Sequence, residues 1–134
     1  MSTKRMLIAF GVALVVLNIY DWLVFGYLLR DFHAQFPRWL KPQDQLPMLK
    51  MFLTGAFNTA VVTLFYALFA RAGAARLSTG IVYGVLLGLI AGWVPQASNR
   101  MLLVDYPFYP IWAYAIFGEY LLVGIVLGLV YKEK

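Results

Sequence analysis

Four polar side chains interrupt apolar stretches of this sequence, and their types could support proton or cation chemistry. Asp21 and Glu119 are acids, and Asn18 and Asn58 are amides. Polar groups at membrane depth are costly and usually face the interior of a helical bundle. An acid in such surroundings favours its protonated form, and a second acid nearby strengthens that preference. Proton-coupled carriers use acids of this kind to bind cations and exchange them for protons.

The four residues fall at matching depths when their spans are counted from the same side of the membrane. At a rise of about 1.5 Å per residue, Asp21 lies about 12 Å and Glu119 about 12–13 Å from the outer ends of their spans. Asn18 and Asn58 both lie about 16 Å deep by the same count. We therefore predict one intramembrane polar cluster in the outer half. At least one of its acids is expected to be protonated near neutral pH or paired with Arg100.

The same cluster also fits a purely structural role, and this interpretation ranks first. A protonated acid can donate a hydrogen bond to Asn18, Asn58 or a backbone carbonyl and so fix the rotation of its helix. It can equally face a partner subunit. Polar contacts between helices are common in small membrane bundles. The residues alone leave the carrier and the structural interpretations open.

The composition excludes several classes of protein. The chain has 134 residues, of which 63% are hydrophobic and 13% charged, with a mean hydropathy of +0.76. A soluble domain has about 25% charged residues, so we expect a single transmembrane domain over residues 1–134. The absence of cysteine excludes disulfides, thiolate metal sites and Cys nucleophiles. The one histidine, His33, excludes a multi-His metal site and is expected to be solvated in a loop; no cofactor is predicted.

Four apolar spans position the polar residues, and they predict an all-α membrane protein built as a four-helix bundle. Each is close to the length of about 20 residues that crosses the hydrocarbon core. Pro47 suits a helix start, and Pro95 marks the end of the third span. The predicted spans cover residues 6–29, 47–70, 79–96 and 111–131.

The connection between the first two spans carries an amphipathic pattern. Phe32, Phe36, Trp39 and Leu40 are spaced i, i+4, i+7 and i+8 with polar residues between them. This pattern is typical of a segment that lies in the membrane interface. Pro37 interrupts it, so two short turns are expected in place of one helix.

Glycines predict how two of the spans pack. Small residues repeat every four positions in the third and fourth spans, at Gly80, Gly84, Gly88 and Gly92, and at Gly124 and Gly128. Such a bare face lets a neighbouring helix approach backbone to backbone. Glu119 lies about 140° around its helix from Gly124. The fourth span therefore has two contact faces, one for the Gly80 ladder and the other for the first span or a second protomer.

Charge predicts the orientation and the partners. With four spans, six Lys and Arg residues lie on the side of the termini and five on the other side. The positive-inside rule then favours termini on the cytoplasmic side of the membrane. The basic residues lie at the ends of spans, where they suit lipid headgroups, and they form no basic face for nucleic acid.

The layout, together with Asn18-Ile19-Tyr20-Asp21 in the first span, resembles small four-span bacterial inner-membrane proteins of uncharacterised function. Small multidrug-resistance exporters share the length and a membrane glutamate, but their key acid lies in the first span in another context, so no residue is carried over. The first functional hypothesis is a non-enzymatic accessory or scaffold subunit, as a homo-oligomer or in a larger membrane complex. The second is a proton-coupled carrier of a small cationic or lipophilic compound that uses Asp21 and Glu119. A lipid-modifying enzyme ranks last, because no His or Ser is suitably placed beside these acids.

Overall fold

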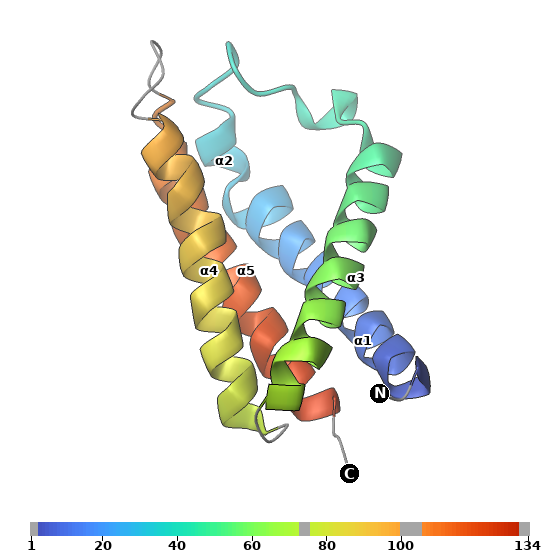
Figure 1. Cartoon of the computed structure of the whole chain (residues 1–134). Helices are drawn as coiled ribbons and strands as arrows, with labels where there is room; N and C mark the ends of the chain where they lie inside the picture. The colour runs from blue at the N-terminus through green and yellow to red at the C-terminus, as the bar shows by residue number, and fades with distance from the viewer. Residues whose placement is uncertain (1–2, 73–75, 100–105, 132–134) are drawn as a thin grey trace.

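The fold consists of helices and turns in a computed structural model that describes residues 3–72, 76–99 and 106–131. Within these ranges, four long helices dominate (Figure 1): α1 (Thr3–Leu23), α3 (Met48–Ala72), α4 (Leu77–Asn99) and α5 (Tyr109–Val130). The last three contain a stretch long and apolar enough to cross a membrane, and α1 forms such a stretch together with the residues up to Leu28. The four stretches are Thr3–Leu28, Met48–Arg71, Leu77–Pro95 and Tyr109–Val130. The chain therefore has the features of a multi-pass membrane protein.

The ends of these four apolar stretches differ from the predicted spans by three residues or fewer, with two local features that the pattern did not indicate. α1 passes into a π-helical turn, η1 (Val24–Leu28), before the one-turn helix α2 (Arg30–His33). Pro95 ends the apolar stretch but does not end the helix, because α4 continues to Asn99. The backbone bond that Pro95 cannot make is a loss that membrane helices tolerate.

Both termini lie at the same end of the molecule (Figure 1). We call this the terminal end; it holds Thr3, the last turn of α3, the first turn of α4 and Tyr131. The opposite end, called the loop end, holds α2, the short 3₁₀ helix η2 (Gln43–Gln45) and the start of α5. Each long helix accordingly has a terminal half and a loop half.

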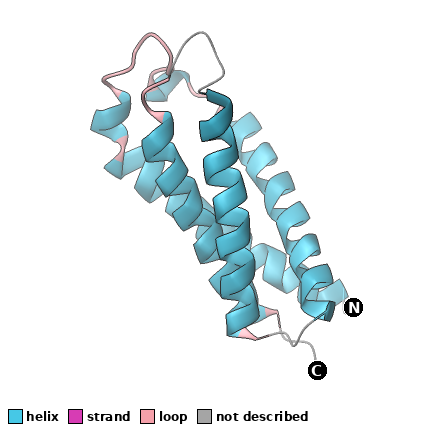
Figure 2. Cartoon of the chain, turned by 60° about the vertical axis from the view of Figure 1, so that its left-hand side comes forward, coloured by secondary structure: helices cyan, strands magenta, loops and turns pink. Residues whose placement is uncertain are grey.

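α4 and α5 run side by side along most of their length (Figures 1 and 2). Gly80 packs directly on the backbone of Gly124 and Gly128. A Cβ atom on Gly84 would lie 2.7 Å from the carbonyl oxygen of Tyr120, and one on Gly92 would lie 2.7 Å from that of Ala113. No side chain fits at these positions, so the two backbones are in direct contact as small-residue helix pairs in membranes are.

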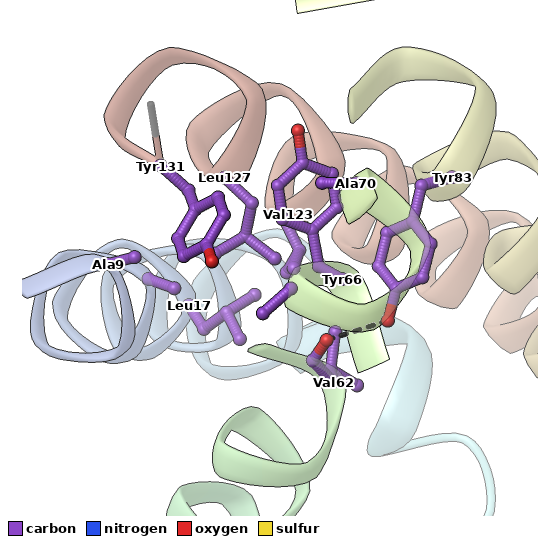
Figure 3. Close-up of a cluster of buried hydrophobic side chains, with 11 residues drawn as sticks. Ala9, Leu17, Val62, Tyr66, Ala70, Tyr83, Val123, Leu127 and Tyr131 are labelled. Carbon is purple, nitrogen blue, oxygen red and sulfur yellow. Dashed lines mark hydrogen bonds between the residues drawn. The ribbon is translucent and has the colours of Figure 1, made fainter. Parts of the chain in front are cut away.

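The buried core lies in the terminal half, where all four long helices meet (Figure 3). α1 contributes Ala9, Ala13 and Leu17, which recur every fourth residue and so share one face. The α3 residues Thr59 and Thr63 are buried there too, with hydroxyls that donate to the carbonyls of Gly55 and Thr59 at 2.8 Å. The remaining hydrophobic residues of the core are Val62, Tyr66, Ala67, Ala70, Tyr83, Val123, Leu127 and Tyr131.

At the loop end, aromatic residues of the predicted interfacial segment pack against the residues that lead into α5. The ring centroids of Phe36 and Phe108 lie 5.7 Å apart, and those of Trp39 and Tyr106 lie 6.1 Å apart. The segment consists of α2 followed by a turn around Pro37, with Leu40 bonding back to Phe36. Aromatic contacts therefore fasten this connection to α5.

Candidate functional site

The two acids come from α1 and α5, two helices that are in contact. Asp21 follows Leu17 by one helical turn, about 40° around α1, so it continues the inward face that Leu17 begins. Glu119 lies in the middle of α5. The two carboxyl groups are within range of electrostatic interaction. The structure thus brings together the pair of acids that the depth count places at one level.

Asn58 of α3 joins the acids through a tyrosine. Its Nδ2 donates a hydrogen bond of 3.0 Å to the hydroxyl of Tyr120, the residue after Glu119. The hydroxyl of Tyr120 is itself within electrostatic range of Asp21 and Glu119. This bond ties the middle of α3 to α5 beside the acids.

Tyr20 provides the corresponding tie between α1 and α5. Its hydroxyl donates to the carbonyl oxygen of Ala115 at 2.6 Å. It reaches that atom across Gly118, where a Cβ would lie 2.6 Å from the tyrosine oxygen. The pattern of polar residues in the spans does not predict either tyrosine as part of the site. The available signal was their position, since each is the immediate chain neighbour of an acid.

The acids themselves do not hold the helices together within the part of the chain that the structure describes. There, neither Asp21 nor Glu119 makes a hydrogen bond or an ion pair. The interhelical hydrogen bonds at this level come from Tyr20 and Tyr120 instead. The carboxyl groups are therefore available to a ligand or partner, which is a different arrangement from a fully satisfied structural network.

Two members of the predicted cluster are not found in it. Asn18 is exposed, and its Nδ2 donates to the carbonyl oxygen of Leu14 on its own helix at 2.7 Å. It lies only about 60° around α1 from Asp21, but its amide group donates within its own helix and not to the acids. Arg100 lies outside the described residues.

The site is accessible because α3 leaves the other helices in its loop half. No residue from Met48 to Asn58 is buried, and burial begins at Thr59. Figure 1 shows the loop half of α3 diverging from α1. As a result Asp21 is exposed and Glu119 and Asn58 are half-buried, although all three side chains belong to inward faces.

His33 lies beyond the spans at the loop end, and the expectation that it is simply solvated is wrong. Its Nε2 accepts a hydrogen bond of 2.9 Å from the indole Nε1 of Trp112. The ring of Phe25 stacks on it at a centroid distance of 6.3 Å and an interplanar angle of 11°. Burial among these rings lowers the pKa of His33. Because Nε2 accepts, the neutral ring carries its proton on Nδ1.

The chemistry of the site is thus that of two carboxyls, two tyrosine hydroxyls and one amide. In the described ranges, no group of three or more His, Cys, Asp or Glu residues could hold a metal ion. No protein-family model matches the chain, and no curated protein or solved structure shows significant similarity to it.

Proposed function

We propose that this chain is a four-helix bundle of the bacterial inner membrane, with cytoplasmic termini, that serves as a non-enzymatic subunit of a larger membrane assembly. One observation carries the proposal. Asp21 and Glu119 lie within helices that are long and apolar enough to span a membrane, beside a loop half of α3 that buries no residue.

The energetics of the bilayer connect these features. A charged acid at the centre of a membrane helix costs about 2.5–3.5 kcal/mol. A partner helix docked against the loop half of α3 would cover its apolar residues, which include Phe52 and Phe57, at 47% and 72% exposure. A basic or amide side chain on that helix would offset the cost at Asp21 and Glu119. A single partner thus accounts for both the exposed helix and the unbonded acids.

The test is recovery of the full chain in mild detergent, followed by size determination and mass spectrometry of whatever co-purifies. Asp21→Asn and Glu119→Gln keep the side-chain shape and remove the charge, so we expect the folded chain to lose its partner. Asp44→Asn is the matched control, since Asp44 is an exposed acid in η2 outside the spans. A wild-type chain that purifies alone, or equal loss in all three variants, would overturn the proposal.

A second function is favoured by the proximity of the two acids. Of two carboxyls that lie within electrostatic range of each other and open beside α3, one can hold a proton and release it when a cation binds. That is the chemistry of a proton-coupled carrier of a small cationic or lipophilic compound. In proteoliposomes, uptake of a lipophilic cation driven by a pH gradient, abolished by Asp21→Asn and Glu119→Gln, would support the carrier. Such uptake by a chain without co-purifying protein would favour it over the subunit.

A further inference from the structure

A groove separates α1 and α3 on the terminal side of the acids, and nothing in the proposed function uses it. Met6, Leu7 and Phe10 of α1 line one wall, and Ala60, Val61 and Leu64 of α3 line the other. Its volume is about 340 Å³, at the small end of ligand pockets.

The groove offers no polar group to a ligand. Thr63 also lines it, but its hydroxyl is committed to the carbonyl of Thr59 at 2.8 Å. The remaining lining side chains are hydrocarbon, thioether or aromatic. An occupant must therefore present apolar surface along the length of the groove.

Basic residues lie toward the terminal end of both walls. Lys4 precedes Leu7 by three residues on α1, so the two side chains are neighbours on the helix surface. Arg71 follows Leu64 by seven residues, two turns along the same face of α3. Both basic residues are exposed. Arg71 lies about 10 Å along α3 beyond Leu64, which places positive charge where the headgroup of a lipid seated in the groove would be.

From this geometry we propose that the groove binds one acyl chain of an anionic phospholipid, with its headgroup phosphate between Lys4 and Arg71. The wall chemistry favours a lipid over a second copy of the chain. Close contact between membrane helices uses small residues, whereas α1 presents the large, flexible side chains Met6, Leu7 and Phe10 here. This inference rests on the membrane placement in the proposed function, but not on the role of the chain as a subunit of a larger assembly.

The experiment is native mass spectrometry of the full chain with an equimolar mixture of phosphatidylglycerol and phosphatidylcholine that share the same acyl chains. Each basic residue near a membrane surface changes binding of anionic lipid about fivefold. We therefore expect preferential retention of phosphatidylglycerol, and a loss of about fivefold in that preference in Lys4→Gln and in Arg71→Gln. Lys50→Gln, at the opposite end of α3, is the control and should change nothing.

A second pair of variants tests the groove itself. Ala60→Phe should fill it and reduce retention of both lipids, whereas Ile90→Phe, on a 61% exposed position of α4, should not. Ala60 is exposed, so the core is not disturbed, and circular dichroism checks that each variant is folded. The proposal would be overturned if the two lipids were retained equally or if Lys50→Gln and Arg71→Gln had equal effects. It would also be overturned if the chain formed a dimer that Ala60→Phe dissociates.

Discussion

The α4–α5 contact and the acid site in the loop half are held by opposite means. Along α4 the contact is backbone on backbone, with Gly80 and Gly84 against Gly124. At the acids, the long side chains Tyr20 and Tyr120 reach across to α5 or α3 by single hydrogen bonds. The first arrangement admits no added atom, and the second leaves α3 free to separate. Rigid and open regions are therefore built into one small helical protein.

The largest expected effect comes from adding one methyl group to the rigid region. Gly80→Ala places a Cβ against the backbone of Gly124 and Gly128, where neither helix can yield without moving apart. Overpacking typically costs about 1–3 kcal/mol, and we expect the upper end or more here because backbone atoms block relief. Unfolding of the detergent-solubilised chain by sodium dodecyl sulfate measures the loss.

Gly55→Ala is the matched control in the open region. A Cβ on Gly55 has nothing within 4 Å, and the same substitution should leave stability unchanged or raise it by up to about 1 kcal/mol through helix propensity. Equal destabilisation by Gly80→Ala and Gly55→Ala would show that the two regions do not differ in how closely their backbones pack.

These two regions also differ in how far the sequence predicts them. Four-residue spacing is enough to place Gly80 and Gly124 on bare helix faces, because helix geometry converts spacing directly into direction. The same geometry directs Asp21 inward. The hydrogen bond of Asn18 does not follow from depth or direction, because Asn18 lies at a similar level to Asp21 and only about 60° around α1 from it. Its amide is satisfied by Leu14 of its own helix.

The separation of α3 is not readable from composition. Residues Met48 to Asn58 are as apolar as a packed helix face, since lipid and protein interior demand similar side chains. The tyrosine ties are equally hidden, because an aromatic residue in a span predicts burial but not which carbonyl or amide its hydroxyl reaches. The π-helical turn at Val24–Leu28 has no clear sequence signal either.

The hydrogen bond between Asn58 and Tyr120 gives the next effect. Polar pairs between membrane helices contribute about 0.6 kcal/mol on average and up to about 1.7 kcal/mol. A double-mutant cycle with Asn58→Ala and Tyr120→Phe should return a coupling energy in that range. A coupling of zero would mean that α3 is not held to α5 at this level, and that the acid site is wider than the structure indicates.

Two buried tyrosines of the terminal half allow a smaller comparison. The hydroxyl of Tyr83 donates to the carbonyl oxygen of Val62 at 2.6 Å, whereas that of Tyr66 is buried with no partner among the described residues. Tyr83→Phe should cost about 1 kcal/mol, because it leaves the bond unmade. Tyr66→Phe should be neutral or slightly stabilising, since it removes an unsatisfied group. Equivalent losses in the two variants, measured by the same unfolding assay, would contradict this assignment.

The smallest effect is a pH dependence at the loop end. Nε2 of His33 must be unprotonated to accept from Trp112, and burial lowers the pKa of His33 in the folded chain. The unfolded chain, with an ordinary pKa of about 6.5, takes up the proton first as the pH falls. This contribution to stability is therefore complete above about pH 6.5 and is lost as the pH falls through the lowered pKa of the folded state.

The matched variants for this effect are His33→Gln and Trp112→Phe. Glutamine keeps an acceptor for the indole but does not titrate. The difference in stability between pH 7.5 and pH 5.5 should therefore be smaller in His33→Gln than in the wild type, by an amount below about 1 kcal/mol. Trp112→Phe removes the donor and should weaken the contact at both pH values. If His33→Gln retains the full pH dependence of the wild type, the titrating group lies elsewhere. The loop end would then be fastened to α5 by its aromatic rings alone, through contacts such as Phe36 on Phe108 that do not respond to protons.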